Sequence, residues 1–408
     1  MGLHRFHPTP SGRMGTLWAL SSIRNAALVE FGSMGHMLYG RATLKRMGKD
    51  PDCKLYSTHI NESDIAMGET NRLTRAIADI ALRDQPRVIF VLPSTIPEMI
   101  GTDLSALCKE LQTSYPHVRL LPFEAGGFNI ELHRGVQETL LLLATTLPQD
   151  VPPTPTPTFN LIGSCTDLFQ FNADTQEIVR MMEGAFGIKP LCIMTSDTSV
   201  EDIEHMGGAH INLVIRREGL SAACHLQQKF GTPLVEGRPY GMQGTYSWLE
   251  QIAQMLDKPI NQSFILQEQA EARPIMAIAP GFFSHQKKPV KLSIGGHADV
   301  VTGILTYACS ELGLTPDLCW CDSPAMATED LPYWQEAQWS QTVTNRHQGL
   351  LMASGEVLTW AGRNNLAMQI ANPSRGWQMY PYSPPYMGLF STVYGISRCN
   401  EFGDHVDE

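Results

Sequence analysis

A histidine follows a glycine turn directly in residues 29–44, which read VEFGSMGHMLYGRATL. The apolar run before Gly32 is typical of a buried strand, and His36 falls where the next helix should begin. The positive end of a helix dipole disfavours imidazolium and leaves the neutral ring, which can ligate a metal. The plainer interpretation is a histidine that packs or bonds nearby backbone. The residues of this turn, taken alone, leave both interpretations open.

Two other predicted strand ends carry polar or glycine residues. Residues 92–104 (LPSTIPEMIGTDL) place Ser94 and Thr95 after the strongest strand, and residues 123–128 (FEAGGF) add a further glycine-containing end. Ser94 and Thr95 have no base nearby in the sequence, which favours a structural turn over a nucleophile. Strand ends of one parallel sheet meet at a single edge. We therefore expect these segments to converge on one crevice within residues 30–130.

The composition excludes several classes of function. The chain has 408 residues and a net charge of −11, which argues against binding nucleic acid through a general basic surface. No apolar run approaches the roughly 20 residues of a membrane span, and no secretory leader is evident, so a cytoplasmic protein is predicted. Neither GxGxxG nor GxxxxGK[ST] occurs, which argues against ATP hydrolysis by this chain. The nine cysteines lie at wide spacings that do not suggest a disulfide framework.

Strand and helix patterns alternate almost throughout, which predicts an α/β fold of three Rossmann-like units with mostly parallel sheets. The first domain is expected over residues 1–150 and is followed by a proline-rich linker over 151–157. The second domain is expected over 158–286. The third covers 287–408 and ends in a tail rich in aromatic residues. Within the third domain, the segment EVLTWAG is predicted to be a strand.

The order of these motifs resembles component 1 of the nitrogenase family, especially its β-type subunits. The segments that carry the resemblance are GSMGH, STHINESDIAMGE, PSTIPEMIGTDL and FEAGGF, followed by NLIGS, INLVIRREG and SPPYMGL. They occur in the family's order over nearly the whole chain. The resemblance implies the nitrogenase component 1 fold and an iron–sulfur cluster shared between two homologous subunits.

The departures from the family pattern concern the cluster ligands. Family cysteines match His36 and Thr95 here, and a third falls near Ser11, so none of the three is a thiol. The β-like subunit of dark-operative protochlorophyllide reductase resembles this case, because it supplies one non-cysteine ligand at the same turn. The resemblance therefore implies His36 as the metal ligand, with Gly35, Thr95 and Gly126 beside the cluster; imidazole can replace thiolate on iron.

A second departure lies at the family's active-site cofactor. The strand that matches the cofactor's cysteine anchor reads INLVIRREG, with Arg216 near that position. Arg216 and Arg217 could face an anionic ligand or could form a salt-bridged helix start. This chain thus resembles the partner of a cofactor-bearing subunit, or a subunit of a complex that binds a different group at this position.

The resemblance implies a β-type subunit of an ATP-dependent, two-component reductase. Its partners would be an α-type subunit in an α2β2-like heterotetramer and an iron–sulfur reductase protein that uses the ATP. Electrons would pass through the interface cluster, and a larger iron–sulfur cofactor would reside in the partner. The reaction favoured by the resemblance is reductive cleavage of a small organosulfur compound, as in methylthio-alkane reductase. The alternatives are a tetrapyrrole reductase and a non-enzymatic scaffold for cofactor assembly.

Overall fold

The computed structural model describes residues 10–47, 49–124, 130–284, 290–346, 349–361 and 366–372. These residues form three four-stranded sheets, in which every pair of neighbouring strands is parallel. The prediction of three Rossmann-like α/β units is therefore confirmed. The predicted domain borders stay a prediction, and the aromatic tail lies outside the described residues.

The first sheet has the order β3-β2-β4-β5. Its strands are β2 (Ala26–Phe31), β3 (Lys54–Ser57), β4 (Val88–Pro93) and β5 (Arg119–Pro122). Every residue of β2 and β4 is buried, as expected for central parallel strands covered on both faces. The helices of this unit are α1 (Gly12–Leu20), α2 (Met34–Arg46), α3 (Glu62–Met67), α4 (Asn71–Arg83), α5 (Thr95–Met99), α6 (Leu104–Gln112) and α7 (Leu132–Thr146).

The second sheet has the order β10-β9-β6-β7. Its strands are β6 (Thr158–Ser164), β7 (Lys189–Thr195), β9 (Ile211–Val214) and β10 (Leu234–Glu236). Its helices are α8 (Phe171–Phe186), α9 (Val200–Glu204), η1 (Met206–Gly208), η2 (Arg217–Gly219), α10 (Leu220–Phe230), α11 (Gly241–Leu256) and α12 (Gln262–Ser284). A short parallel pair, β1 (Ile23–Arg24) with β8 (Thr198–Ser199), joins this unit to the first.

The third sheet has the order β12-β11-β13-β14. Its strands are β11 (Lys291–Gly296), β12 (Thr315–Cys321), β13 (Leu350–Ser354) and β14 (Leu366–Ala371). Its helices are α13 (Ala298–Ser310), η3 (Pro324–Met326), α14 (Glu336–Arg346) and α15 (Gly355–Trp360). The strand predicted for EVLTWAG is wrong, because the strand is the segment before it and Ser354 then caps α15 by accepting a hydrogen bond from the Val357 N–H.

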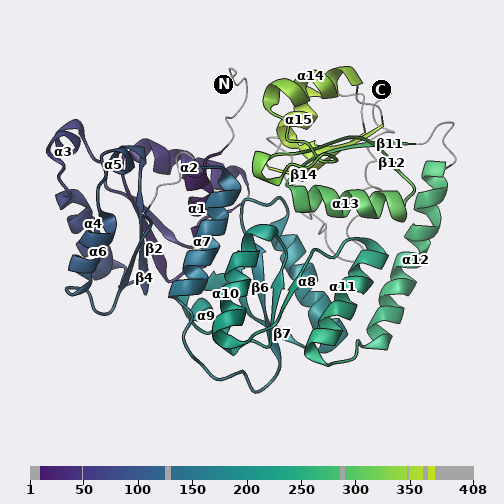
Figure 1. Cartoon of the computed structure of the whole chain (residues 1–408), viewed down its shortest axis with the longest axis horizontal. Coiled ribbons are helices and arrows are strands. Elements are labelled where there is room, and N and C mark those ends of the chain that lie inside the picture. The colour runs from purple at the N-terminus through teal and green to yellow at the C-terminus, as the bar shows by residue number, and fades with distance from the viewer. Residues whose placement is uncertain are drawn as a thin grey trace.

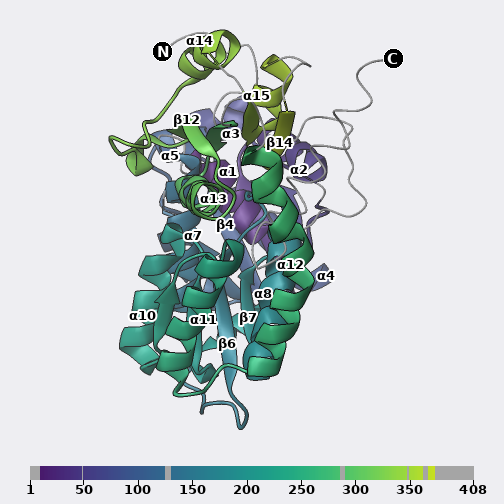
Figure 2. The same cartoon turned by 90° about the vertical axis from the view of Figure 1, so that its right-hand side faces the viewer.

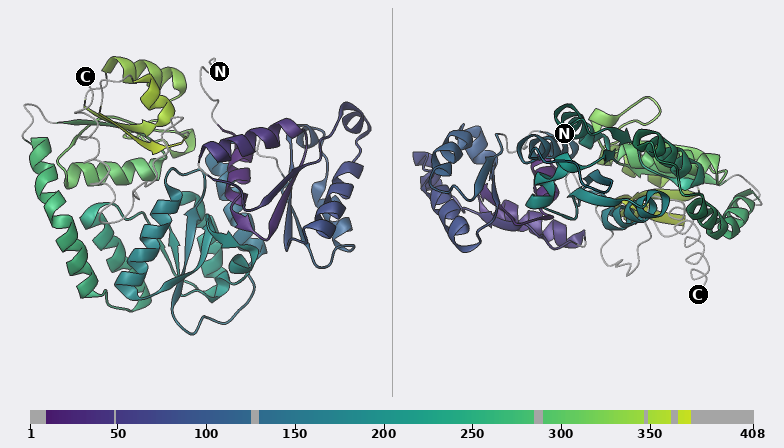
Figure 3. Two further views of the ribbon diagram at one scale, coloured as in Figure 1. Left: turned by 180° about the vertical axis from the view of Figure 1, so that it is seen from behind. Right: turned by 90° about the horizontal axis from the view of Figure 1, so that it is seen from below.

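The first and third units each have an apolar cluster of their own, and two further clusters cross the borders between units. Figure 1 shows the first and third units above and to either side of the second, and Figure 2 shows the third unit over α8, α11 and the β6–β7 pair. The view from behind in Figure 3 shows α1 and α7 at the border of the first and second units. One apolar cluster joins Leu20 and Val136 to Met194, and another joins Phe159 to Ile294. Because these clusters cross the borders, the junction between units is packed like an interior.

The described part of the chain gives no sign of a membrane span, since none of its helices is both long and apolar enough. The eight cysteines within it are all free thiols, as the spacing predicted.

Candidate functional site

The turn after β2 is shaped by close contact with the start of α5. A Cβ on Gly32 would lie 2.3 Å from both Cβ and Oγ of Ser94, far inside van der Waals contact. The Ser94 N–H donates to the Phe31 carbonyl oxygen at 3.0 Å. Glycine at position 32 therefore allows the ends of β2 and β4 to lie in close contact with each other. The role of Gly32 is structural. The predicted convergence of these strand ends is present for β2 and β4.

Gly35 is different, because nothing in the described chain requires a glycine there. It lies in the first turn of α2, is exposed, and a Cβ added to it meets no atom within 4 Å. Glycine in a helix destabilises it by roughly 0.5–1 kcal/mol relative to alanine. The absent side chain leaves open space on the outer surface beside His36.

His36 stands two residues inside α2, with a side chain that is 42% exposed. Its Nδ1 atom is buried, has no hydrogen-bond partner among the residues that the structure describes, and lies 3.7 Å from Oε1 of Glu30. Partial burial and the neighbouring Arg13 both lower the pKa of His36. The neutral imidazole predicted from the helix dipole is thus favoured here by desolvation and by a cation. With Nδ1 buried, Nε2 is the nitrogen available to a ligand outside the chain.

Two buried charges of opposite sign lie beneath His36, and neither was predicted from the sequence. Arg13 is 4% exposed and Glu30 is 2% exposed, and Nη1 of Arg13 lies 3.3 Å from Oε1 of Glu30. That contact lacks hydrogen-bond geometry, so Arg13 Nε and Nη1 and Glu30 Oε1 make no hydrogen bond within the described part of the chain. Burial raises the pKa of Glu30 to about 7, although Arg13 opposes the shift. A glutamate within the otherwise apolar strand ALVEF was the signal that could have revealed this pair.

The other predicted site residues lie on neighbouring elements. Thr95 begins α5, directly after the Ser94 that touches Gly32, and Ser11 precedes α1, which carries Arg13 to Glu30. Ser11 also pairs with Glu131 through a backbone bridge. Gly126 lies outside the described residues.

Six large apolar side chains surround this corner of the molecule and are each at least 41% exposed. We call them the apolar edge: Met34, Leu38, Tyr39, Ile96, Met99 and Ile100. They lie on α2 and at α5, the two helices that follow the adjacent strands β2 and β4. Several exposed large apolar side chains on two neighbouring helices are typical of an interaction surface.

Arg216 does not face an open anion site. Its side chain is fully buried, with Nη1 donating to both carboxylate oxygens of Asp167 at 2.9 and 3.0 Å and Nε donating to Glu218 at 2.9 Å. Arg217 forms a second pair with Asp299. Of the two interpretations of this segment, the salt-bridged helix start is correct.

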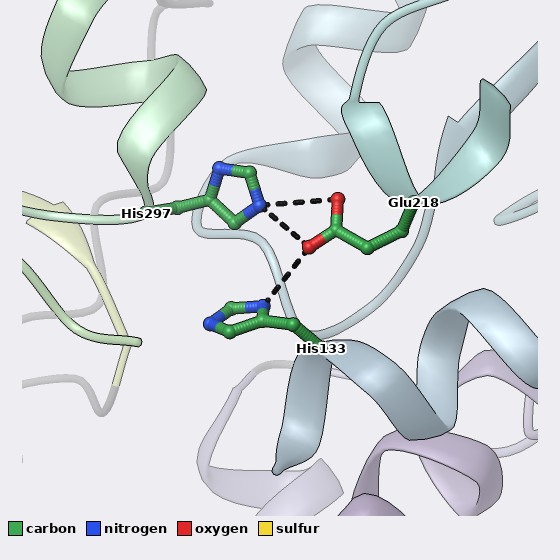
Figure 4. A group of neighbouring side chains, drawn as sticks. All are labelled: His133, Glu218 and His297. Carbon is green, nitrogen blue, oxygen red and sulfur yellow. Dashed lines mark hydrogen bonds and ion pairs between the residues drawn. The ribbon is translucent and has the colours of Figure 1, made fainter. Parts of the chain in front are cut away.

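Glu218 is also the centre of a histidine pair. Nδ1 of His133, on α7, lies 3.2 Å from Glu218 Oε1, and Nε2 of His297, the residue before α13, lies 2.9 Å from the same oxygen. Figure 4 shows both rings directed at this carboxylate. The other ring nitrogen of His133 lies 3.1 Å from Asp322. This group was not predicted from the sequence, although His297 follows a glycine-ending strand just as His36 does.

The stability of the metal-free chain should depend on the charge of His133. Burial lowers the pKa of His133, but Asp322 and Glu218 outweigh it and raise that pKa to about 10. The stabilisation is fully present below the unfolded value near 6.5 and is lost as pH rises through about 10. Between pH 6.5 and 10, with a chelator present, wild type should lose on the order of 3 kcal/mol more unfolding free energy than His133→Gln. Chemical denaturation at both pH values measures this, with exposed His117→Gln as the control that should track wild type.

Comparisons with known proteins agree with this architecture. The family described as nitrogenase component 1 type oxidoreductase matches residues 11–353. The nitrogenase iron-molybdenum cofactor biosynthesis protein NifE of Klebsiella pneumoniae is 28% identical over 287 residues, which are 67% of this chain and 60% of that protein. A light-independent protochlorophyllide reductase subunit of Synechococcus sp. (strain JA-3-3Ab) is 26% identical over 318 residues, which are 72% of this chain and 60% of that protein. The chain thus spans 60% of the length of each of these two relatives.

A solved structure described as nitrogenase Cp1 at pH 6.5 superposes with a TM-score of 0.81 and 17% identity, covering 100% of this chain and 97% of that one. This likeness concerns the fold. Together with the family match over most of the sequence, it settles the classification: the chain belongs to the nitrogenase component 1 type oxidoreductase family.

Proposed function

We propose that this chain is the β-type subunit of a nitrogenase-like reductase and that an iron–sulfur cluster lies between its β2–α2 turn and an α-type partner. The observation that carries the proposal is the half-exposed His36 beside Gly35. His36 has a lowered pKa, and the missing Cβ of Gly35 is unexplained by any contact within the described chain. A cluster held from outside needs both a neutral donor and space for close approach.

The donor set fits a cluster to which this chain contributes a minority of the ligands. His36 offers an imidazole nitrogen, whereas Thr95 and Ser11 offer only hydroxyl groups in place of thiolates. Clusters of this type are held mainly by thiolates, so the partner would supply the remaining ligands. Gly35 and Thr95 would border the cluster, and Gly126 remains part of the proposal from the sequence alone.

The cluster would store and pass electrons, and the residues of this chain would hold and insulate it. His36 Nε2 would bind it, while the neutral state of the ring keeps the lone pair free. The apolar edge would pack on the α-type subunit and exclude water from the cluster. An iron–sulfur reductase protein would consume the ATP and deliver the electrons, in the α2β2-like assembly that the resemblance implies.

For the reaction we propose reductive cleavage of a small organosulfur compound, with the larger cofactor in the partner subunit. A relative named as a protochlorophyllide reductase subunit supports a tetrapyrrole as the alternative substrate. A relative named as a cofactor biosynthesis protein supports a second function, a scaffold for cofactor assembly. Turnover of a methylthio-alkane with ATP and reductant would favour the organosulfur reductase. Turnover of protochlorophyllide would favour the tetrapyrrole reductase, and transfer of a cofactor without turnover would favour the scaffold.

The variant His36→Ala tests the cluster directly. Purified with its partner in the absence of oxygen, this variant should lose most of the interface iron and its paramagnetic-resonance signal, because one ligand is removed. His36→Cys should retain the iron and change the spectrum, since a thiolate replaces the imidazole. His117→Ala, an exposed histidine before β5, is the matched control. Iron content and spectrum unchanged in His36→Ala would contradict the assignment.

A further inference from the structure

The three units meet at a buried group of side chains drawn from each of them. His133 belongs to α7 of the first unit, Glu218 to η2 of the second, and His297 precedes α13 of the third. Their exposed fractions are 7%, 2% and 3%, and one ligand atom of each lies within 4.8 Å of those of the other two. Histidine and glutamate are usual nitrogen and oxygen ligands of divalent transition metals.

The arrangement of the three donors is close to that of a metal centre. Glu218 Oε1 lies 3.2 Å from His133 Nδ1 and 2.9 Å from His297 Nε2. Metal–nitrogen and metal–oxygen bonds of about 2.0–2.2 Å in a tetrahedral site separate neighbouring ligand atoms by about 3.3–3.6 Å. The rings would therefore move outward by a few tenths of an ångström to admit an ion between them. Figure 4 shows both rings already turned to the same carboxylate.

The charges around the group favour an added cation. Arg216 is bonded to two carboxylates, Asp167 and Glu218, and Asp322 adds a third through His133. With both histidines neutral, three carboxylates against one guanidinium leave two negative charges uncompensated. The neighbouring Arg217–Asp299 pair is neutral and does not alter this balance. Two protons on the histidines or one divalent ion would neutralise the group, and a buried charge excess is costly.

We infer that His133 Nδ1, Glu218 and His297 Nε2 form a mononuclear site for a divalent transition metal, with Zn²⁺ as the best-matched ion. Asp322 would support it as a carboxylate–histidine–metal arrangement, since it already contacts the other nitrogen of His133 at 3.1 Å. If His297 binds the ion through Nε2, the proton of its neutral ring lies on Nδ1. Nδ1 can then no longer accept the hydrogen bond that the Asp299 N–H now donates to it. Arg216 Nε would keep Glu218 oriented through Oε2. Arg216 Nη2 lies 3.2 Å from Glu218 Oε1 and 3.4 Å from His133 Nδ1, and it would move aside to admit the ion.

The site would join the three units rather than react with substrate. All three ligands are buried and each belongs to a different unit, so one ion would tie α7, η2 and the start of α13 together. Asp322, whose side chain is 42% exposed, places one member of the group in contact with solvent. This inference does not depend on the cluster proposed at His36, because the two groups share no residue.

Metal analysis of the full chain, purified without chelators, tests the site. We expect one zinc ion per chain in wild type and in His36→Ala, and none in His297→Gln or Glu218→Gln, with His117→Gln retaining it. Titration of metal-free chain with Co²⁺ should give visible ligand-field absorption in wild type and in His117→Gln, and none in His297→Gln. Zinc should also raise the melting temperature of the metal-free wild type.

X-ray absorption on the zinc-loaded wild type tests the site without any variant, so the inference can still be refuted if the variants do not fold. Two imidazole nitrogens and one or two carboxylate oxygens on the ion would support the site. Absence of saturable Co²⁺ or Zn²⁺ binding at micromolar concentration would overturn it and leave a hydrogen-bonded ionic network. Sulfur ligands on the ion, or binding that survives His297→Gln, would overturn it as well.

Discussion

Arg216→Met is expected to lower the free energy of unfolding of this chain by about 3–5 kcal/mol, because it leaves two carboxylates buried without their cation. The guanidinium side chain is 0% exposed, and Asp167 and Glu218 beside it are 1% and 2% exposed. Methionine fills similar space but donates no hydrogen bond, so the cost is electrostatic. Chemical denaturation followed by tryptophan fluorescence measures the effect.

The adjacent residue provides the control. Arg217 forms a comparable pair with Asp299, but its side chain is 45% exposed, so solvent screens the interaction. Arg217→Met should lower the unfolding free energy by about 1 kcal/mol or less. If the two variants lose equal stability, burial does not set the strength of the Arg216 network.

Much of the fold could be predicted because its strands are buried on both faces. Continuous apolar segments such as residues 88–93 are typical of parallel strands that are covered on both faces. A glycine after such a segment marks where the strand ends and the chain turns. The error at EVLTWAG arose because this segment is apolar enough for either a strand or a helix. In the structure the polar Ser354 caps the helix that this segment forms.

The candidate functional residues were only partly predictable from the sequence. The reason differs between the turn at His36 and the contacts that join separate elements. The turn at His36 is local, so its residues marked it as a candidate, and the family resemblance then favoured a metal ligand there. The Arg13–Glu30 contact and the His133–Glu218–His297 group join residues from separate elements, and their proximity depends on how helices and units pack. One local signal was present in each case: a glutamate inside an apolar strand, and a histidine after the glycine pair Gly295–Gly296.

The packing that positions the His36 turn can itself be tested at Gly135. A Cβ at this position on α7 would lie 1.9 Å from the backbone oxygen of Gly12 at the start of α1, and 2.5 Å from the carbonyl carbon. Because the obstacle is backbone, no side chain can rotate away. Gly135→Ala should therefore displace α1 and lower the unfolding free energy by about 3 kcal/mol, at the upper end of overpacking effects. Denaturant midpoints measure it.

Gly35→Ala is the matched control and should separate folding from function. Its Cβ meets nothing within 4 Å, so the isolated chain should keep its stability or gain about 0.5–1 kcal/mol from the better helix former. The same methyl group would fill the space beside His36 where the cluster is proposed to approach. Gly35→Ala should thus reduce interface iron in the complex without destabilising the chain, whereas Gly135→Ala should reduce both, since α1 carries Arg13 to Glu30. Full iron content in a stable Gly35→Ala complex would mean that nothing approaches this surface closely, and would count against the proposed interface.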